Sequence, residues 1–146
     1  MILHKIHPIK ASENIITTPF SLSYVCAGFP SPAENYLDKA LDLNELMINH
    51  PEATFFVRVS GESMIGAGIC PNDILVVDRA CEPKINDIVV ALVFGEFTVK
   101  RWIQKGRSMY LQAENPLYPS IKITEDMNFE IWGVVTYAIH SLHALA

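Results

Sequence analysis

From residue 54 onward, apolar and polar side chains alternate with a period of two over several stretches, a spacing that is typical of β-strands. In residues 55–60 this alternation places Phe55, Val57 and Val59 on one face of a predicted strand. Runs rich in β-branched and aromatic residues predict further strands at 74–77, 88–93, 97–103, 109–113 and 129–139. The pattern therefore predicts a mostly β body.

Two glycines shape the expected connections of these strands. Phe94 and Gly95 separate the strands 88–93 and 97–103, which predicts a hairpin. Because phenylalanine resists a positive φ, we expect a type I turn with the glycine in a bulge rather than a type I′ turn. Gly133 is expected to break the last strand.

One short stretch ahead of the β body has helical spacing. Asp42 and Glu45 form a variant of the capping box, and residues 43–47 carry apolar side chains at helical spacing. Pro51 is expected to end this helix after His50. The sequence therefore predicts one short amphipathic helix.

The N-terminal part of the chain differs in character from the rest. Residues 1–27 show no sustained periodicity, and Pro19 favours extended backbone just before it. A stretch with one glycine and two prolines, residues 27–32, follows as an expected linker. Residues 1–27 hold two basic residues and one acidic residue (+1), whereas residues 28–146 hold nine basic and fifteen acidic residues (−6). We therefore expect an N-terminal arm, 1–27, and a folded domain, 28–146.

Composition narrows the class of protein. With 146 residues, 50% of them hydrophobic and 18% charged, the chain can bury a sizeable core as one domain. Its apolar runs are far shorter than the roughly 20 residues that a membrane span needs, and no signal peptide is evident. The net charge of −5 argues against a protein that grips nucleic-acid phosphates. A soluble, cytoplasmic protein without direct DNA binding is expected.

Metal and cofactor chemistry are not expected. The three cysteines form no C-x-x-C motif. Two H-x-x-H pairs, His4 with His7 and His140 with His143, lie near the chain ends without a cysteine or carboxylate in step. Solvated histidines are therefore favoured over metal ligands.

Ser63 lies in the segment Ser-Gly-Glu-Ser-Met, residues 60–64, where the first predicted strand ends. A turn after a strand can expose a nucleophile on a rigid scaffold. Glycine and serine are also common in ordinary turns, and the segment alone favours that interpretation.

A nucleophilic serine needs a base, and the histidines lie near the chain ends or at the end of the predicted helix. The remaining option is a lysine whose pKa, normally about 10.4, is lowered by burial. Lys100 is the candidate, because strand alternation places it with Thr98 and Trp102 on one face of 97–103. Spacing alone favours a competing interpretation, a basic edge that protects the sheet and is formed by Lys100, Arg101, Lys105 and Arg107.

Three segments in order resemble the signatures of one family: Ser-Gly-Glu-Ser-Met at 60–64, Glu-Phe-Thr-Val-Lys at 96–100, and Ala-Gly-Phe-Pro-Ser-Pro at 27–32. The family is that of the self-cleaving serine–lysine peptidases of the LexA type, and the likeness is closest to UmuD-type SOS mutagenesis proteins, over residues 25–137. The segments 42–46 and 72–78 match as well. The resemblance implies a LexA/signal-peptidase-like (β-clip) peptidase domain, mostly β, with one short helix and an extended N-terminal arm.

The resemblance also implies roles for individual residues. Ser63 would be the nucleophile, Lys100 the general base, and the bond cut would join Ala27 to Gly28. Backbone N–H groups of Ser63 and Met64 would form the oxyanion hole. No metal or cofactor is implied.

The cleavage segment departs from part of the family. Some close relatives have Cys-Gly at the cut, whereas here the cysteine is one position earlier, at Cys26, and alanine precedes the glycine. Small residues on both sides keep the backbone accessible, so the role of the segment is unchanged. Cys26 as a rival nucleophile is disfavoured, because no neighbour in sequence would lower its pKa.

For partners, the resemblance implies a RecA–single-stranded DNA filament that stimulates cleavage. It further implies a homodimer of the shortened chain and a UmuC-like Y-family polymerase subunit active in translesion synthesis.

Three other classes of protein are alternatives to this function. A LexA-type repressor would need an N-terminal DNA-reading domain of about 60 residues. The other two alternatives are a processing peptidase related to signal peptidases and an interaction module with an idle site.

Overall fold

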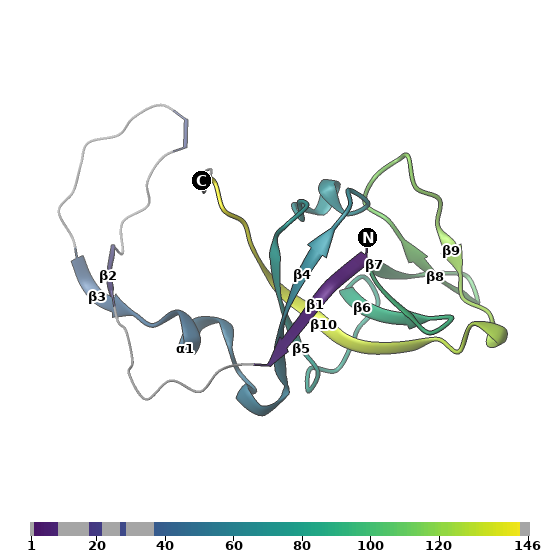
Figure 1. Cartoon of the computed structure of the whole chain (residues 1–146), viewed down its shortest axis with the longest axis horizontal. Coiled ribbons are helices and arrows are strands. Elements are labelled where there is room, and N and C mark those ends of the chain that lie inside the picture. Colours follow the sequence, from purple (N-terminus) through teal and green to yellow (C-terminus); the bar gives the residue numbers. More distant parts are fainter. Residues whose placement is uncertain (1, 9–17, 22–26, 29–36, 144–146) are drawn as a thin grey trace. The chain divides into compact units, whose positions relative to one another are not determined.

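The computed structural model describes residues 2–8, 18–21, 27–28 and 37–143. The chain divides into two compact units, one formed by Met1–Ile9 with His50–Ala146 and the other by Lys10–Asn49. The elements of both units are labelled in Figure 1. Among the described residues, no helix is long and apolar enough to cross a membrane.

The larger unit is built on one antiparallel sheet of eight strands, as the mostly β prediction requires. Their order across the sheet is β1-β4-β5-β10-β6-β7-β8-β9. The strands are β1 (Ile2–Pro8), β4 (Thr54–Ser60), β5 (Ile74–Asp78), β6 (Ile88–Val93), β7 (Glu96–Lys105), β8 (Ser108–Gln112), β9 (Ile121–Lys122) and β10 (Glu130–Ile139).

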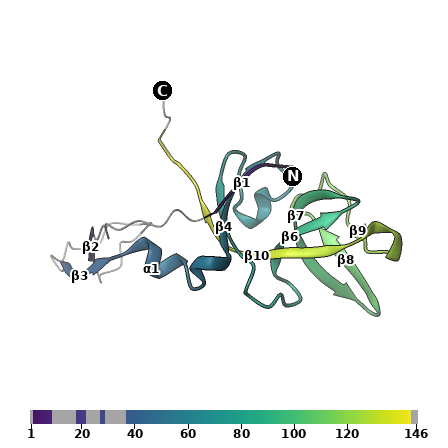
Figure 2. The ribbon, with the colours of Figure 1, turned by 60° about the horizontal axis from the view of Figure 1, so that its bottom comes forward.

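Strand β10 lies between β5 and β6 in the sheet. It thereby joins the strands β1, β4 and β5 to the strands β6, β7, β8 and β9, and its course can be followed in Figures 1 and 2. Its first residues pair with β6, with Glu130 opposite Leu92, and its last residues pair with β5, with Ile139 opposite Ile74. The predicted break at Gly133 is wrong, because the strand continues through it with a bulge between Ile131 and Gly133.

Strand β1 closes the sheet on itself. It pairs antiparallel with β4 along its length, and Ile2 lies opposite both Ser60 of β4 and Thr98 of β7. The strands β1, β4, β5, β10, β6 and β7 therefore form a closed ring, from which β8 and β9 extend. The sequence showed no strand pattern in residues 2–8, so β1 is a finding of the structure. Closure brings the end of β4 close to the middle of β7.

Two buried clusters form the core, one on each side of β7. The larger packs Phe97 and Val99 with residues of β4, β5 and β6, and the smaller packs Trp102 with Leu111 of β8. The predicted division of β7 into two faces is confirmed. Fully buried members of the larger cluster are Val57, Val59, Met64, Leu75, Val77, Val90 and Val99.

The smaller unit contains a two-stranded sheet and the single α-helix of the described residues. Strands β2 (Thr18–Ser21) and β3 (Leu37–Leu41) pair antiparallel, and the extended backbone predicted around Pro19 is confirmed. Helix α1 (Leu43–Met47) begins after Asp42, whose side chain accepts a hydrogen bond from Asn44 N at 2.9 Å. The helix is shorter than predicted, because Ile48 is already extended and Pro51–Ala53 forms a separate 3₁₀ turn.

The hairpin between β6 and β7 differs from the prediction. Phe94 and Gly95 both have positive φ, 49° and 79°, so the turn is of the I′ kind. Val93 pairs with Glu96 directly across the two-residue loop, and a loop this short needs the twist of a type I′ turn. The expectation that phenylalanine would avoid positive φ was therefore wrong.

Close packing explains why residue 133 is a glycine. A Cβ atom there would lie 2.6 Å from Cγ1 of Val77, which is fully buried in the core. We expect Gly133→Ala to lower the free energy of unfolding by about 1–3 kcal/mol, because the core must shift to admit the methyl group. Urea unfolding at neutral pH measures this change. A loss below about 0.5 kcal/mol would show that the core relaxes freely there.

Candidate active site

Ser63 lies in a tight turn that follows β4. Gly61 takes a positive φ of 85°, and the 3₁₀ turn η2 (Ile65–Ala67) follows two residues after the serine. Met64, fully buried in the larger core cluster, anchors the turn, and its carbonyl accepts a hydrogen bond from Ala67 N at 3.0 Å. The Ser63 side chain is thereby held on a rigid support, and the residue is fully buried.

Lys100 lies in the middle of β7, opposite Val89 of β6, and is only 5% exposed. Its Nζ is 3.2 Å from Ser63 Oγ, 3.1 Å from Thr98 Oγ1 and 3.2 Å from the carbonyl oxygen of Val99. The structure therefore brings together the two residues that the sequence placed 37 positions apart.

The competing interpretation of a basic edge is wrong for Lys100, because β7 lies between β6 and β8 inside the sheet. Lys105 and Arg107 are exposed, as that interpretation expected. Arg101 is half-buried and forms an ion pair with Glu114. Of the four residues of the predicted basic edge, only Lys105 and Arg107 are therefore exposed to solvent.

Burial lowers the pKa of Lys100 below its ordinary value, because desolvation disfavours the charged amine. Among the described residues, no carboxylate forms an ion pair with it. A neutral amine has two N–H bonds and one lone pair, which fits two acceptors, Thr98 Oγ1 and the Val99 carbonyl, and one donor, the Ser63 hydroxyl. The arrangement is suited to taking a proton from serine.

The N–H groups expected to form the oxyanion hole lie in the same turn. In the part of the chain that the structure describes, nothing accepts a hydrogen bond from the backbone N–H of Ser63 or Met64. Their role as oxyanion donors stays a prediction.

The predicted cleavage bond lies in the smaller unit. Ala27 and Gly28 are exposed and form a bend of the backbone. Their exposure and the small size of both residues are compatible with the predicted role, which stays a prediction. Cys26 and residues 29–32 of the expected linker lie outside the described residues.

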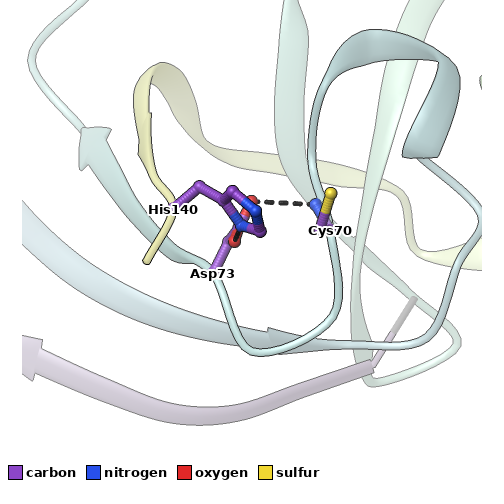
Figure 3. A group of neighbouring side chains, drawn as sticks. All are labelled: Cys70, Asp73 and His140. Atoms are coloured by element: carbon purple, nitrogen blue, oxygen red, sulfur yellow. Dashed lines mark hydrogen bonds and ion pairs between the residues drawn. The ribbon is translucent and has the colours of Figure 1, made fainter. Parts of the chain in front are cut away.

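Sequence reasoning missed a second polar group, which joins the turn ahead of β5 to the residue after β10 (Figure 3). The Asp73 carboxylate, 2% exposed, accepts a hydrogen bond from Cys70 N at 2.8 Å and pairs with His140 Nδ1 at 2.5 Å. The backbone of Asp73 also binds β4, since Val59 N donates to its carbonyl at 3.1 Å. Asp73 therefore fixes the point where the Ser63 loop returns to the sheet.

The same group contains potential metal ligands. One ligand atom from each of Cys70, Asp73 and His140 lies within 4.8 Å of the other two, and these residue types bind zinc in proteins. The hydrogen bonds to Asp73 already account for the burial of its carboxylate. His140 thus has a carboxylate beside it after all, although the two residues are 67 positions apart.

Comparison with known proteins matches the Peptidase S24-like family model over residues 19–136. The protein ImpA of Salmonella typhimurium is 47% identical over 119 residues, which cover 82% of this chain and 81% of ImpA. The protein MucA of Escherichia coli is 43% identical over 131 residues, 89% of each chain. A LexA repressor from Shewanella oneidensis is 35% identical over 123 residues, 84% of this chain and 58% of the repressor.

The buried lysine makes stability depend on pH. Its lowered pKa means that the unfolded chain binds more protons than the folded chain between that pKa and about 10.4. Lys100→Met removes this effect. We expect the stability of this variant relative to its parent to be greatest at neutral pH and to decline as the pH approaches about 10.

Urea unfolding at several pH values, with both chains carrying Ser63→Ala, measures the difference. Lys105→Met, which removes an exposed lysine of the same strand, is the control for the loss of a lysine from β7. A constant difference for Lys100→Met would mean that Lys100 titrates alike in the folded and unfolded chains.

Proposed function

The chain belongs to the Peptidase S24-like family and is a self-cleaving serine peptidase of the SOS mutagenesis type, and we propose that Ser63 and Lys100 cut its own bond between Ala27 and Gly28. The observation that carries the assignment is the 3.2 Å contact between Lys100 Nζ and Ser63 Oγ inside the sheet. A lysine whose pKa is lowered by burial is the kind of base that can act near neutral pH.

The reaction begins with proton transfer from the Ser63 hydroxyl to neutral Lys100. Ser63 Oγ bonds to the carbonyl carbon of Ala27, and the N–H groups of Ser63 and Met64 bind the resulting oxyanion. The bond to Gly28 then breaks, and the Lys100 ammonium returns its proton to the leaving amine. Lys100 then takes a proton from water, and the hydroxide bonds to the acyl carbon of Ala27. The bond from this carbon to Ser63 Oγ breaks, Lys100 returns the proton to Ser63 Oγ, and the new acid on Ala27 loses its proton to solvent.

The substrate is part of the same chain, so its effective concentration replaces binding affinity. Cleavage in cis gives one turnover for each chain. The catalytic groups therefore need to be ready before the scissile bond arrives, and the rigid turn around Ser63 meets that need.

Removal of residues 1–27 changes the sheet as well as the length of the chain. Strand β1 lies within the released segment, yet it pairs with β4 and touches β7 at Thr98. Its departure opens the closed ring and leaves edges of β4 and β7 without that partner. The remaining domain, 28–146, is the unit that forms a homodimer.

The partners follow from the UmuD type. A RecA–single-stranded DNA filament stimulates the cut, and the shortened homodimer is an accessory subunit of a UmuC-like Y-family polymerase in translesion synthesis. Residues 28–146 carry a net charge of −6, from nine basic and fifteen acidic residues, so contact with DNA through protein partners suits this domain better than direct binding.

Self-cleavage is the direct test. Purified chain incubated at alkaline pH, or at neutral pH with RecA bound to single-stranded DNA, should yield fragments 1–27 and 28–146 by intact mass. Ser63→Ala and Lys100→Ala should each reduce the cleavage rate by about 10³-fold or more, because the nucleophile and its base act only as a pair. Lys105→Ala is the matched control and should cleave normally. A wild-type chain that stays whole in both conditions would support the idle interaction module.

The rate should also depend on pH in one direction. Because the neutral amine of Lys100 is the base, the rate should rise about tenfold per pH unit below its pKa and level off above it. The lowered pKa places this rise below the ordinary range of lysine. Rate constants from neutral to mildly alkaline pH measure the profile, and a rate that falls over this interval rules out the lysine base.

A further inference from the structure

The peptide bond between Glu62 and Ser63 is held from outside its own turn. The Glu62 carbonyl accepts a hydrogen bond from Asn115 Nδ2 at 2.9 Å, in addition to one from Ile65 N at 3.3 Å within the turn. A peptide unit is planar, and its C=O and N–H point in opposite directions. Fixing the Glu62 carbonyl therefore also fixes the direction of the Ser63 N–H.

A second contact holds the other end of the same turn. Gly66 N donates a hydrogen bond to the carbonyl of Glu114, the neighbour of Asn115, at 2.7 Å. A Cβ atom at position 66 would lie only 2.6 Å from that carbonyl oxygen, so a residue without a side chain is needed for this approach. Glu114 and Asn115 thus bind the turn on both sides of Ser63, and we call these two residues the brace.

The brace is itself attached to the strand that carries Lys100. Arg101, the next residue along β7, forms an ion pair with the Glu114 carboxylate through Nε. Its guanidinium also donates to the carbonyl of Asn86 at 2.6 Å. One strand therefore places the base directly and places the nucleophile's turn through Arg101 and the brace.

We propose that Asn115 is a positioning residue: its amide aims the Ser63 N–H at the oxyanion, and Glu114 and Arg101 keep the brace in register with Lys100. The proposal rests on the proposed function, because it takes Ser63 as the nucleophile. A hydrogen bond to the carbonyl side of a peptide also polarises its N–H, which strengthens the donor. Removing one oxyanion donor costs about 10²–10³-fold in rate, so misaiming one has a large effect.

A purely structural role for Asn115 would use a different atom of its side chain. Asn115 Oδ1 accepts a hydrogen bond from Leu117 N at 3.0 Å, which stabilises the loop that follows. Asn115→Asp keeps this acceptor and loses the donor to Glu62. Asn115→Ala loses both groups and adds no charge.

Gln104 offers a matched control. Its Nε2 donates to the carbonyl of Gly106 at 3.1 Å in the turn after β7. Gln104→Glu therefore removes an amide donor from a turn carbonyl and adds one negative charge, as Asn115→Asp does. Its side chain is exposed.

The experiment measures the self-cleavage rate constant of the full chain against pH, with thermal unfolding to verify that each variant folds. We expect Asn115→Asp and Asn115→Ala to lower the plateau rate by about 10- to 100-fold and to leave the midpoint of the pH profile unchanged. Gln104→Glu should stay within about twofold of wild type. If Asn115→Ala does not fold, the self-cleavage rate constant of Asn115→Asp tests the proposal.

Three results would overturn the proposal. Wild-type cleavage by Asn115→Asp would mean that Asn115 acts only through its bond from Leu117. Slow cleavage by Asn115→Asp beside wild-type cleavage by Asn115→Ala would assign the effect to charge, and a shifted midpoint with an unchanged plateau would assign it to Lys100. Failure of the proposed function is separate, because then Ser63→Ala would cleave as fast as wild type.

Discussion

Burial of the Lys100 amine is the constraint on which the rest of the site depends. Desolvation of an ammonium is costly, and the two apolar clusters that surround β7 create this cost by excluding water from the amine. Three polar contacts of the amine offset part of it. The same cost lowers the pKa of Lys100. An exposed lysine in this strand, such as Lys105, lacks both the desolvation and the contact with Ser63.

The closed ring of strands determines how close Ser63 and Lys100 lie to each other. Ser63 follows β4, and Lys100 is in β7, which is separated from β4 in the sheet by β5, β10 and β6. Strand β1 connects the two directly, because Ile2 lies opposite both Ser60 and Thr98. A segment whose removal is the proposed outcome of the reaction therefore also completes the sheet around the reacting groups.

The sequence predicted the strands well where local pattern and final environment agree. Residues 88–93 have the same bounds as β6, because a short apolar run that is rich in β-branched residues and followed at position 95 by a glycine favours a buried strand. The sequence pattern gave wrong predictions where pairing with another strand determines the backbone conformation more strongly than the side chains do. Residues 2–8 pair with β4 despite lacking a period of two, and Phe94 accepts a positive φ because Val93 and Glu96 pair across it.

The site was predictable only in part, for a related reason. Spacing alone favoured an exposed basic edge, because the burial of Lys100 depends on β7 having neighbours on both sides. Family resemblance supplied the pairing with Ser63. Neither source indicated the hydrogen bond from Asn115 to Glu62 or the pair of Asp73 with His140, since these residues lie 53 and 67 positions apart and meet only through the sheet.

These long-range contacts have a common place in the molecule. Asp73 fixes the end of the Ser63 loop to β4, and the brace of Glu114 and Asn115 holds its beginning. A tethered substrate arrives at high effective concentration, but the reaction still needs aligned donors and a base at the moment of attack. For a self-cleaving peptidase, alignment that is built into the fold does not depend on the binding of a separate substrate. Polar anchors at both ends of the Ser63 loop hold it in one position before any substrate arrives.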